Sequence, residues 1–143
     1  MRIALFQGPE QPGTVAGNLE RLRQAAGAAA ARGARLLVCP EMFLTGYHIG
    51  PEATRRLAEP ADGPSAQQAA AIARASGLAL LYGYPELAPD GSVFNAALLV
   101  ERDGRRLANH RKSHLFGDLD RARSAPARAP RRWPRSTACG SAS

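Results

Sequence analysis

The sequence has almost no lysine: of its 19 basic residues, 18 are arginine and only Lys112 is lysine. Arginine therefore serves wherever a surface cation is enough. A position that keeps lysine needs what arginine cannot give, namely a compact charge whose pKa responds to its surroundings. Lys112 is thus a candidate functional residue, with a chance surface lysine as the alternative that composition leaves open.

Long apolar runs and cysteine pairs are also missing. No stretch reaches the roughly 18 apolar residues of a membrane span. The start, MRIALFQGPEQPG, lacks the apolar core and cleavage site of a signal peptide. The two cysteines, Cys39 and Cys139, have no metal-ligand spacing. We therefore expect a cytoplasmic protein with no membrane partner, no metal and no cofactor.

The positive charge is unevenly distributed. The net charge is +7, and residues 122–143 contribute +5 of it with five arginines and no acid, which leaves +2 for residues 1–121. The body also lacks the interleaved aromatic residues on which nucleic acid bases stack. We expect no nucleic acid partner, although nucleic acid binding through the basic tail remains an alternative.

Apolar strands and helices alternate as far as Arg121. Strands are predicted at 2–7, 34–39, 78–85, 93–101 and 105–111. Helices are predicted at 16–32, 52–57 and 66–76, with Thr14 and Ser65 as N-caps of the first and last. The strand–helix–strand order implies parallel pairing of the first strands, and Arg-Asp-Gly between the last two is typical of a hairpin. This order predicts an α/β layered fold.

The periodicity stops after Arg121. Residues 122–143 are dominated by Ala, Arg, Pro and Ser and follow neither the helix nor the strand period. We therefore predict two regions, a folded part at 1–121 and an irregular, disordered basic tail at 122–143.

Two polar residues stand out for their chemistry. The stretch LLVCPEMFLTGY (36–47) carries an apolar strand directly into Glu41, and NHRKSHLFGDLDR (109–121) contains Lys112. A carboxylate at a strand end can transfer protons, and an ammonium group can stabilise a developing negative charge. A carboxylate in this place is more often just the first residue of a loop. Glu41 becomes a candidate only together with Lys112.

With LLYGYPE and FNAALLVERDG, these stretches resemble the nitrilase or carbon–nitrogen hydrolase superfamily over residues 1–121. The resemblance implies part of an α-β-β-α sandwich, a homo-oligomer for the full-length family, and hydrolysis of a small amide, carbamoyl compound or nitrile. It also implies a Glu–Lys–Cys mechanism. By position, Glu41 matches the family's general base and Lys112 matches the lysine that stabilises the oxyanion.

The family's nucleophilic cysteine has no match. Cys139 lies in Thr-Ala-Cys-Gly-Ser with no apolar strand before it, and Cys39 is expected to be a small core residue. We therefore predict a truncated, inactive carbon–nitrogen hydrolase, with a non-catalytic small-molecule-binding or regulatory protein as the alternative. A shifted reading of GC-rich codons from Trp133 onward yields a β-periodic sequence similar to the family's strands, so the tail is also interpreted as an out-of-frame product.

Other residues are weaker candidates for pocket or second-layer roles: Tyr47, His48, Glu86, His114, Asp118 and Asp120. Tyr47 and His48 follow Glu41 in a loop that either lines the pocket or is plain surface. Asp118 or Asp120 is similar in position to a further carboxylate of the family. His114 stands four residues after His110, but we expect a structural or pocket-lining role and no metal.

Two further expectations concern buried polar groups and stability. Glu86 is expected to bond to Lys112 or its loop, or to be an exposed loop acid, and Asn95 to be a satisfied buried polar group. Half of a sandwich leaves apolar faces and strand edges uncovered, so we also expect poor solubility or a molten state.

Overall fold

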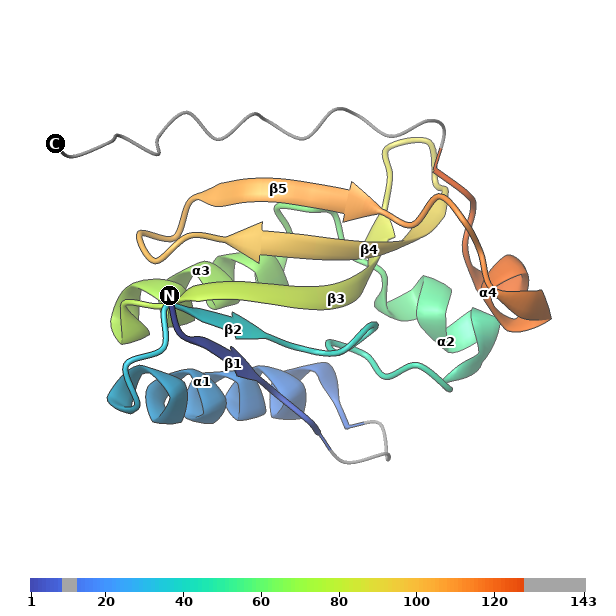
Figure 1. The fold of residues 1–143 in the computed structure, drawn as a ribbon. Helices are drawn as coiled ribbons and strands as arrows, with labels where there is room; N and C mark the ends of the chain where they lie inside the picture. The colour runs from blue at the N-terminus through green and yellow to red at the C-terminus, as the bar shows by residue number, and fades with distance from the viewer. Residues whose placement is uncertain (9–12, 128–143) are drawn as a thin grey trace, which may run out of the picture.

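The structure is a computed structural model that describes residues 1–8 and 13–127. Cys139 and most of the segment predicted to be a tail lie outside the described residues. The strands are β1 (Ile3–Leu5), β2 (Leu36–Val38), β3 (Ala79–Leu87), β4 (Val93–Val100) and β5 (Arg106–Arg111). The helices are α1 (Val15–Ala31), α2 (Gly50–Leu57), α3 (Pro64–Ser76) and α4 (Gly117–Arg123). They form the α/β arrangement expected from the sequence (Figure 1).

The strands form one five-stranded sheet in chain order, β1-β2-β3-β4-β5. The first three strands are parallel because a helix returns the chain between each pair. Strands β3, β4 and β5 follow as antiparallel neighbours. The predicted parallel pair and the predicted hairpin are both confirmed.

Helices α1 and α3 pack on one face of the sheet, where they cover the core (Figure 1). Their contact residues include Leu22 and Ala26 of α1 and Ala69 and Ala73 of α3, all fully buried. Alanine at these positions lets the two helices approach each other and the sheet closely. The strand residues on this face are largely buried as well, so the core lies between the helices and one side of the sheet.

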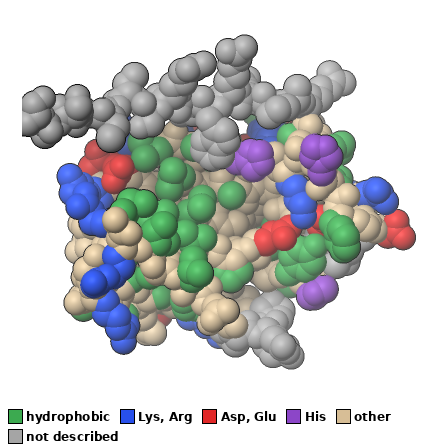
Figure 2. Space-filling model, in the orientation of Figure 1, with side chains coloured by type: hydrophobic (Ala, Val, Ile, Leu, Met, Phe, Trp, Pro, Cys, Tyr) green, Lys and Arg blue, Asp and Glu red, His purple; other side chains and the backbone are tan. Residues whose placement is uncertain are grey.

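The other face of the sheet carries an apolar row without a helix over it. In register across four strands lie Leu5, Val38, Leu81 and Leu99. Leu5 is 75% exposed, and the other three are half-buried. Figure 2 shows hydrophobic side chains gathered on the side of the molecule where Figure 1 shows the strands. Within residues 1–8 and 13–127, this sheet face is therefore apolar and not covered by a helix.

This open face makes a prediction about solution behaviour. We expect the chain to bind a hydrophobic dye such as anilinonaphthalene sulfonate and to self-associate as its concentration rises. The reason is that an exposed apolar patch is stabilised when another apolar surface covers it. Leu5→Glu should weaken both effects. Gln67→Glu, the same change in charge on the exposed side of α3, should leave them as they are. Sedimentation velocity and dye fluorescence measure this, and a monomer that binds no dye would contradict it.

One local prediction was wrong, and one helix was not predicted. Ser65 is not the N-cap of α3, because Gly63 takes that place and Pro64 occupies the first turn. Ser65 instead donates its backbone N–H and its hydroxyl to the carboxylate of Glu59. The boundary predicted after Arg121 falls inside α4, which was not predicted and which ends at Arg123.

Candidate active site

Glu41 sits in a tight turn that follows β2 and rests on β3. Met42, the next residue, has a positive φ of 52° and is fully buried. Leu44 donates its backbone N–H to the carbonyl of Gly83 at 3.0 Å. A Cβ built on Gly83 would lie 2.4 Å from the Met42 nitrogen, so only glycine allows this close approach. The turn is thereby fixed directly against the backbone of β3.

Lys112 comes directly after β5. Its backbone N–H donates to the carbonyl of Asn95 at 2.8 Å, which continues the β4–β5 pairing by one residue. Lys112 thus follows β5 at the end of the sheet where Glu41 follows β2. Ligand sites of α/β sheets gather at such strand ends.

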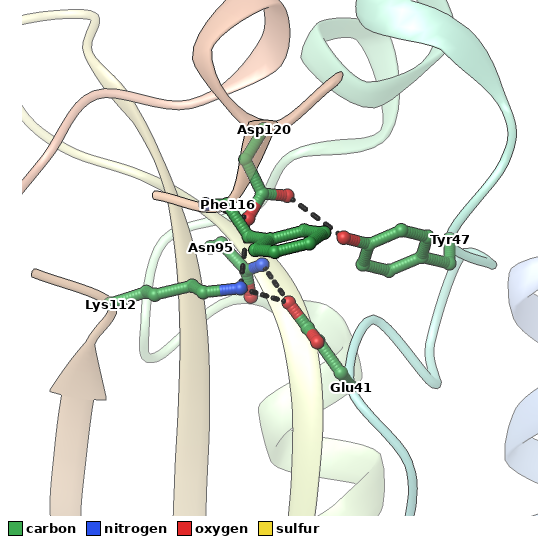
Figure 3. Close-up of polar contacts among 6 residues, drawn as sticks. All are labelled: Glu41, Tyr47, Asn95, Lys112, Phe116 and Asp120. Atoms are coloured by element: carbon green, nitrogen blue, oxygen red, sulfur yellow. Dashed lines mark hydrogen bonds and ion pairs between the residues drawn. The ribbon is translucent and has the colours of Figure 1, made fainter. Parts of the chain in front are cut away.

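The two candidate residues meet. Lys112 Nζ lies 2.8 Å from Glu41 Oε1 and 2.8 Å from Asp120 Oδ2. Asn95 donates its side-chain Nδ2–H to the same Glu41 oxygen at 2.5 Å. Figure 3 shows Lys112 pointing between the two carboxylates, with Asn95 beside Glu41. The structure therefore brings together residues that are 71 positions apart in the chain.

Asp120 joins the two loops that carry these residues. Its side chain is fully buried and accepts hydrogen bonds from Lys112, from the Phe116 backbone N–H at 3.0 Å and from the Tyr47 hydroxyl at 3.2 Å. Tyr47 belongs to the loop after Glu41, and Phe116 precedes α4 (Figure 3). Of the two acids predicted here, Asp120 and not Asp118 contacts Lys112.

The carboxylates keep Lys112 charged. Partial burial by itself lowers the pKa of the ammonium group, but hydrogen bonds from Lys112 to Asp120 and Glu41 outweigh it and raise the pKa above the ordinary lysine value. A proton that is held this firmly is not transferred at neutral pH. Lys112 is suited to stabilise negative charge and unsuited to act as a base or a nucleophile.

Three predicted candidates lie apart from this cluster. His48 is exposed and contacts the ring of Tyr47, and His114 is exposed and shares a hydrogen bond with Ser113. Asp118 is exposed, with its nearest ion-pair partner Arg121 at 3.7 Å. No hydrogen bond or ion pair joins any of them to Glu41 or Lys112 in the described part of the chain.

Glu86 is buried inside β3 and is not an exposed loop acid. Its carboxylate forms a two-point ion pair with Arg111, at 2.6 and 2.9 Å, and accepts a hydrogen bond from Asn109 at 2.8 Å. The Arg111 guanidinium also lies 4.2 Å from the centre of the Phe94 ring. Glu86 therefore does not contact Lys112, but it anchors the residue that precedes Lys112.

Cys39 cannot serve as the nucleophile. It belongs to the helix-covered core, and burial raises the pKa of its thiol to about 12. A thiol with that pKa supplies almost no thiolate at neutral pH. Within residues 1–8 and 13–127, no other cysteine exists, so the described part of the chain holds Glu41 and Lys112 without a thiol beside them.

Residues 1–8 and 13–127 contain no group of three or more His, Cys, Asp or Glu side chains arranged to hold a metal ion. No helix among them is both long and apolar enough to cross a membrane.

Sequence reasoning missed part of this arrangement. Asn95 was predicted to be a buried polar group with a hydrogen-bond partner. That this partner is Glu41 depends on how the strands pair, and it was not predicted. Arg111 could not be singled out as the partner of Glu86, because the sequence contains 18 arginines. The glycine at position 83, within a strand otherwise apolar, was a readable sign of close backbone approach.

Comparison with known proteins agrees with the geometry. Residues 2–139 match the carbon-nitrogen hydrolase family. The chain is 60% identical over 120 residues to a protein of Pseudomonas protegens named "Hydrolase in pqqF 5'region", a match that covers 84% of this chain and 41% of that protein. It is 34% identical over 105 residues to the omega-amidase NIT2 of Danio rerio, covering 73% of this chain and 37% of that protein.

A solved structure gives the same result. The chain superposes on an amidase from Nesterenkonia sp. with a TM-score of 0.73 and 30% identity, covering 91% of this chain and 49% of the amidase. The chain therefore spans about half the length of the proteins that it matches, or less. From the family match, these relatives and this fold, the chain belongs to the carbon–nitrogen hydrolase family of the nitrilase superfamily.

Proposed function

We propose that this chain carries the glutamate–lysine part of an amidase site for small amides, and that by itself it does not turn them over. The observation that carries the proposal is the contact between Lys112 Nζ and Glu41 Oε1 at 2.8 Å. Mutants of the Nesterenkonia amidase, which shares the fold, have been captured with acrylamide and with butyramide, which supports short amides as the substrate class.

In the proposed reaction Glu41 is the general base. It takes the proton of a cysteine thiol while the sulfur attacks the amide carbon, and the carbonyl oxygen becomes an oxyanion beside the Lys112 ammonium group. When the C–N bond breaks, Glu41 returns the proton to the nitrogen and ammonia leaves. Water then attacks the thioester, with Glu41 again taking a proton, and the acid and the free thiol are released.

The described residues supply every group of this scheme except the thiol. Base and cation without a nucleophile retain little of the rate enhancement, because they act on a covalent step that cannot occur. We therefore expect the chain to bind a short amide such as butyramide without releasing ammonia. This is also what the alternative function, small-molecule binding without catalysis, would show.

A chimera separates the two functions. Residues 1–121 of this chain are joined to the part of the Pseudomonas protegens hydrolase that lies beyond its matched region, a pairing favoured by the 60% identity. We expect the chimera to release ammonia from butyramide and the chain alone to release none. A folded chimera that binds butyramide but is inactive would reject the amidase proposal in favour of binding alone.

We also propose that the segment after Arg121 comes from a shifted reading frame. The periodic sequence obtained by shifting the frame from Trp133 supports this interpretation. Nucleotide sequencing of the locus downstream of codon 121 tests it, since the proposal requires a strand followed by cysteine in the alternative frame.

A further inference from the structure

Asn95 is a buried amide in an apolar strand. It is only 4% exposed and stands between Phe94 and Ala96 of β4. Its side chain donates to Glu41 Oε1 at 2.5 Å, and its backbone carbonyl accepts from the Lys112 N–H at 2.8 Å. One residue thus contacts both members of the candidate site, Glu41 through its side chain and Lys112 through its main chain.

The two oxygens of Glu41 have different surroundings. Oε1 accepts from both Asn95 and Lys112, whereas Oε2 accepts no hydrogen bond from any residue that the structure describes. The Glu41 side chain is 44% exposed, so packing alone does not hold it in one rotamer. Fixed donors are needed to decide which oxygen turns toward Lys112.

We propose that Asn95 is a positioning residue that holds Glu41 Oε1 on Lys112 and thereby leaves Oε2 as the basic atom presented to the reacting group. An amide suits this task because its N–H donates to a carboxylate without carrying a charge that would compete with Lys112. Because the Lys112 backbone N–H donates to the Asn95 carbonyl, β4 also fixes the spacing between Glu41 and Lys112. The role of Oε2 rests on the proposed function. The hydrogen bond by which Asn95 positions Glu41 can be tested without measuring turnover.

The single lysine provides the probe. The chain has two amines, Lys112 Nζ and the N-terminal amine of Met1, so trace acylation by acetic anhydride labels two sites that mass spectrometry separates. Only the deprotonated amine is acylated. The labelling rate of Lys112 relative to Met1, followed against pH, therefore reports how strongly the carboxylates keep the Lys112 amine protonated. The carboxylates that face Lys112 are Glu41 and Asp120, with the Tyr47 hydroxyl on Asp120.

Asn95→Leu should release Glu41 and raise the relative labelling rate of Lys112 severalfold, toward the value for Glu41→Gln. Asn95→Ser, whose hydroxyl is too short to reach Glu41, should act in the same way if the leucine variant folds poorly. In the Glu41→Gln background, Asn95→Leu should change nothing further, because its effect passes through Glu41. Local unfolding would raise labelling in both backgrounds.

The matched control is Thr54→Val. Thr54 is fully buried and donates its hydroxyl to the Gly50 carbonyl, so it is an equally buried polar side chain whose hydrogen bond stays within its own helix, α2. It should leave Lys112 labelling unchanged. Equal labelling in Asn95→Leu, Asn95→Ser and the unmodified chain would overturn the proposal, as would an effect of Asn95→Leu that persists without the Glu41 carboxylate. If the chimera is inactive while these results hold, the proposed function fails and the positioning role stands.

Discussion

Replacing Glu41 with glutamine in the chimera is expected to lower kcat for butyramide by about 10⁴-fold, because the amide cannot take the proton of the thiol. Butyramide binding should change much less, since glutamine keeps the size and the hydrogen-bonding oxygen of glutamate. Ammonia release under saturating substrate measures the first effect, and calorimetric titration measures the second.

The control for this experiment is Glu52→Gln, the same substitution at an exposed position in the first turn of α2. It should retain full activity. Loss of activity in both variants would point to damage from the substitution itself, and a Glu41→Gln chimera that keeps a tenth or more of its activity would show that Glu41 is not the base.

The second large effect concerns stability. Replacing Glu86 with leucine should lower the free energy of unfolding of the chimera by about 3 kcal/mol, since it leaves Arg111 and Asn109 without their shared acceptor. The loss lies at the low end of the range for a broken buried ion pair because the Arg111 side chain is 35% exposed and water can solvate it. Urea unfolding followed by circular dichroism measures the loss.

An exposed ion pair is the control for Glu86. Glu20 pairs with Arg23 on the surface of α1, with both side chains about half exposed, and Glu20→Gln should leave the free energy of unfolding unchanged within error. If Glu86→Leu also leaves the free energy of unfolding unchanged, the Glu86–Arg111 pair does not anchor the end of β5. Lys112 must then be positioned by its other contacts.

Much of the fold could be predicted because its signals are local. The helix capped by Thr14, the apolar strand that ends before Pro40 and the turn around Gly104 each follow from a few neighbouring residues. The start of α3 was mispredicted because its capping carboxylate, Glu59, comes from before the helix, where a nearby serine gave a more familiar signal.

The site was predictable only in part, for a related reason. Glu41 and Lys112 were recognised by their motifs, and Asp120 was one of two acids that the motif allowed. Which acid reaches Lys112 depends on α4, a short helix that the sequence did not reveal. The partner of Asn95 depends on the register of β4 against its neighbours, and register is a property of the sheet that no single segment carries.

The closeness of Gly83 to the turn after β2 bears on how this site tolerates mutation. Where the turn that carries Glu41 rests on β3, Gly83 offers main chain alone, and its carbonyl accepts from the Leu44 N–H. Main-chain atoms are the same in every residue. Substitutions elsewhere along β3 can therefore alter the core without changing the Gly83 backbone on which the Glu41 turn rests. The vulnerability is concentrated in one position instead: a single methyl group gained at residue 83 would clash with the backbone of Pro40, Glu41 and Met42, the segment that carries the carboxylate.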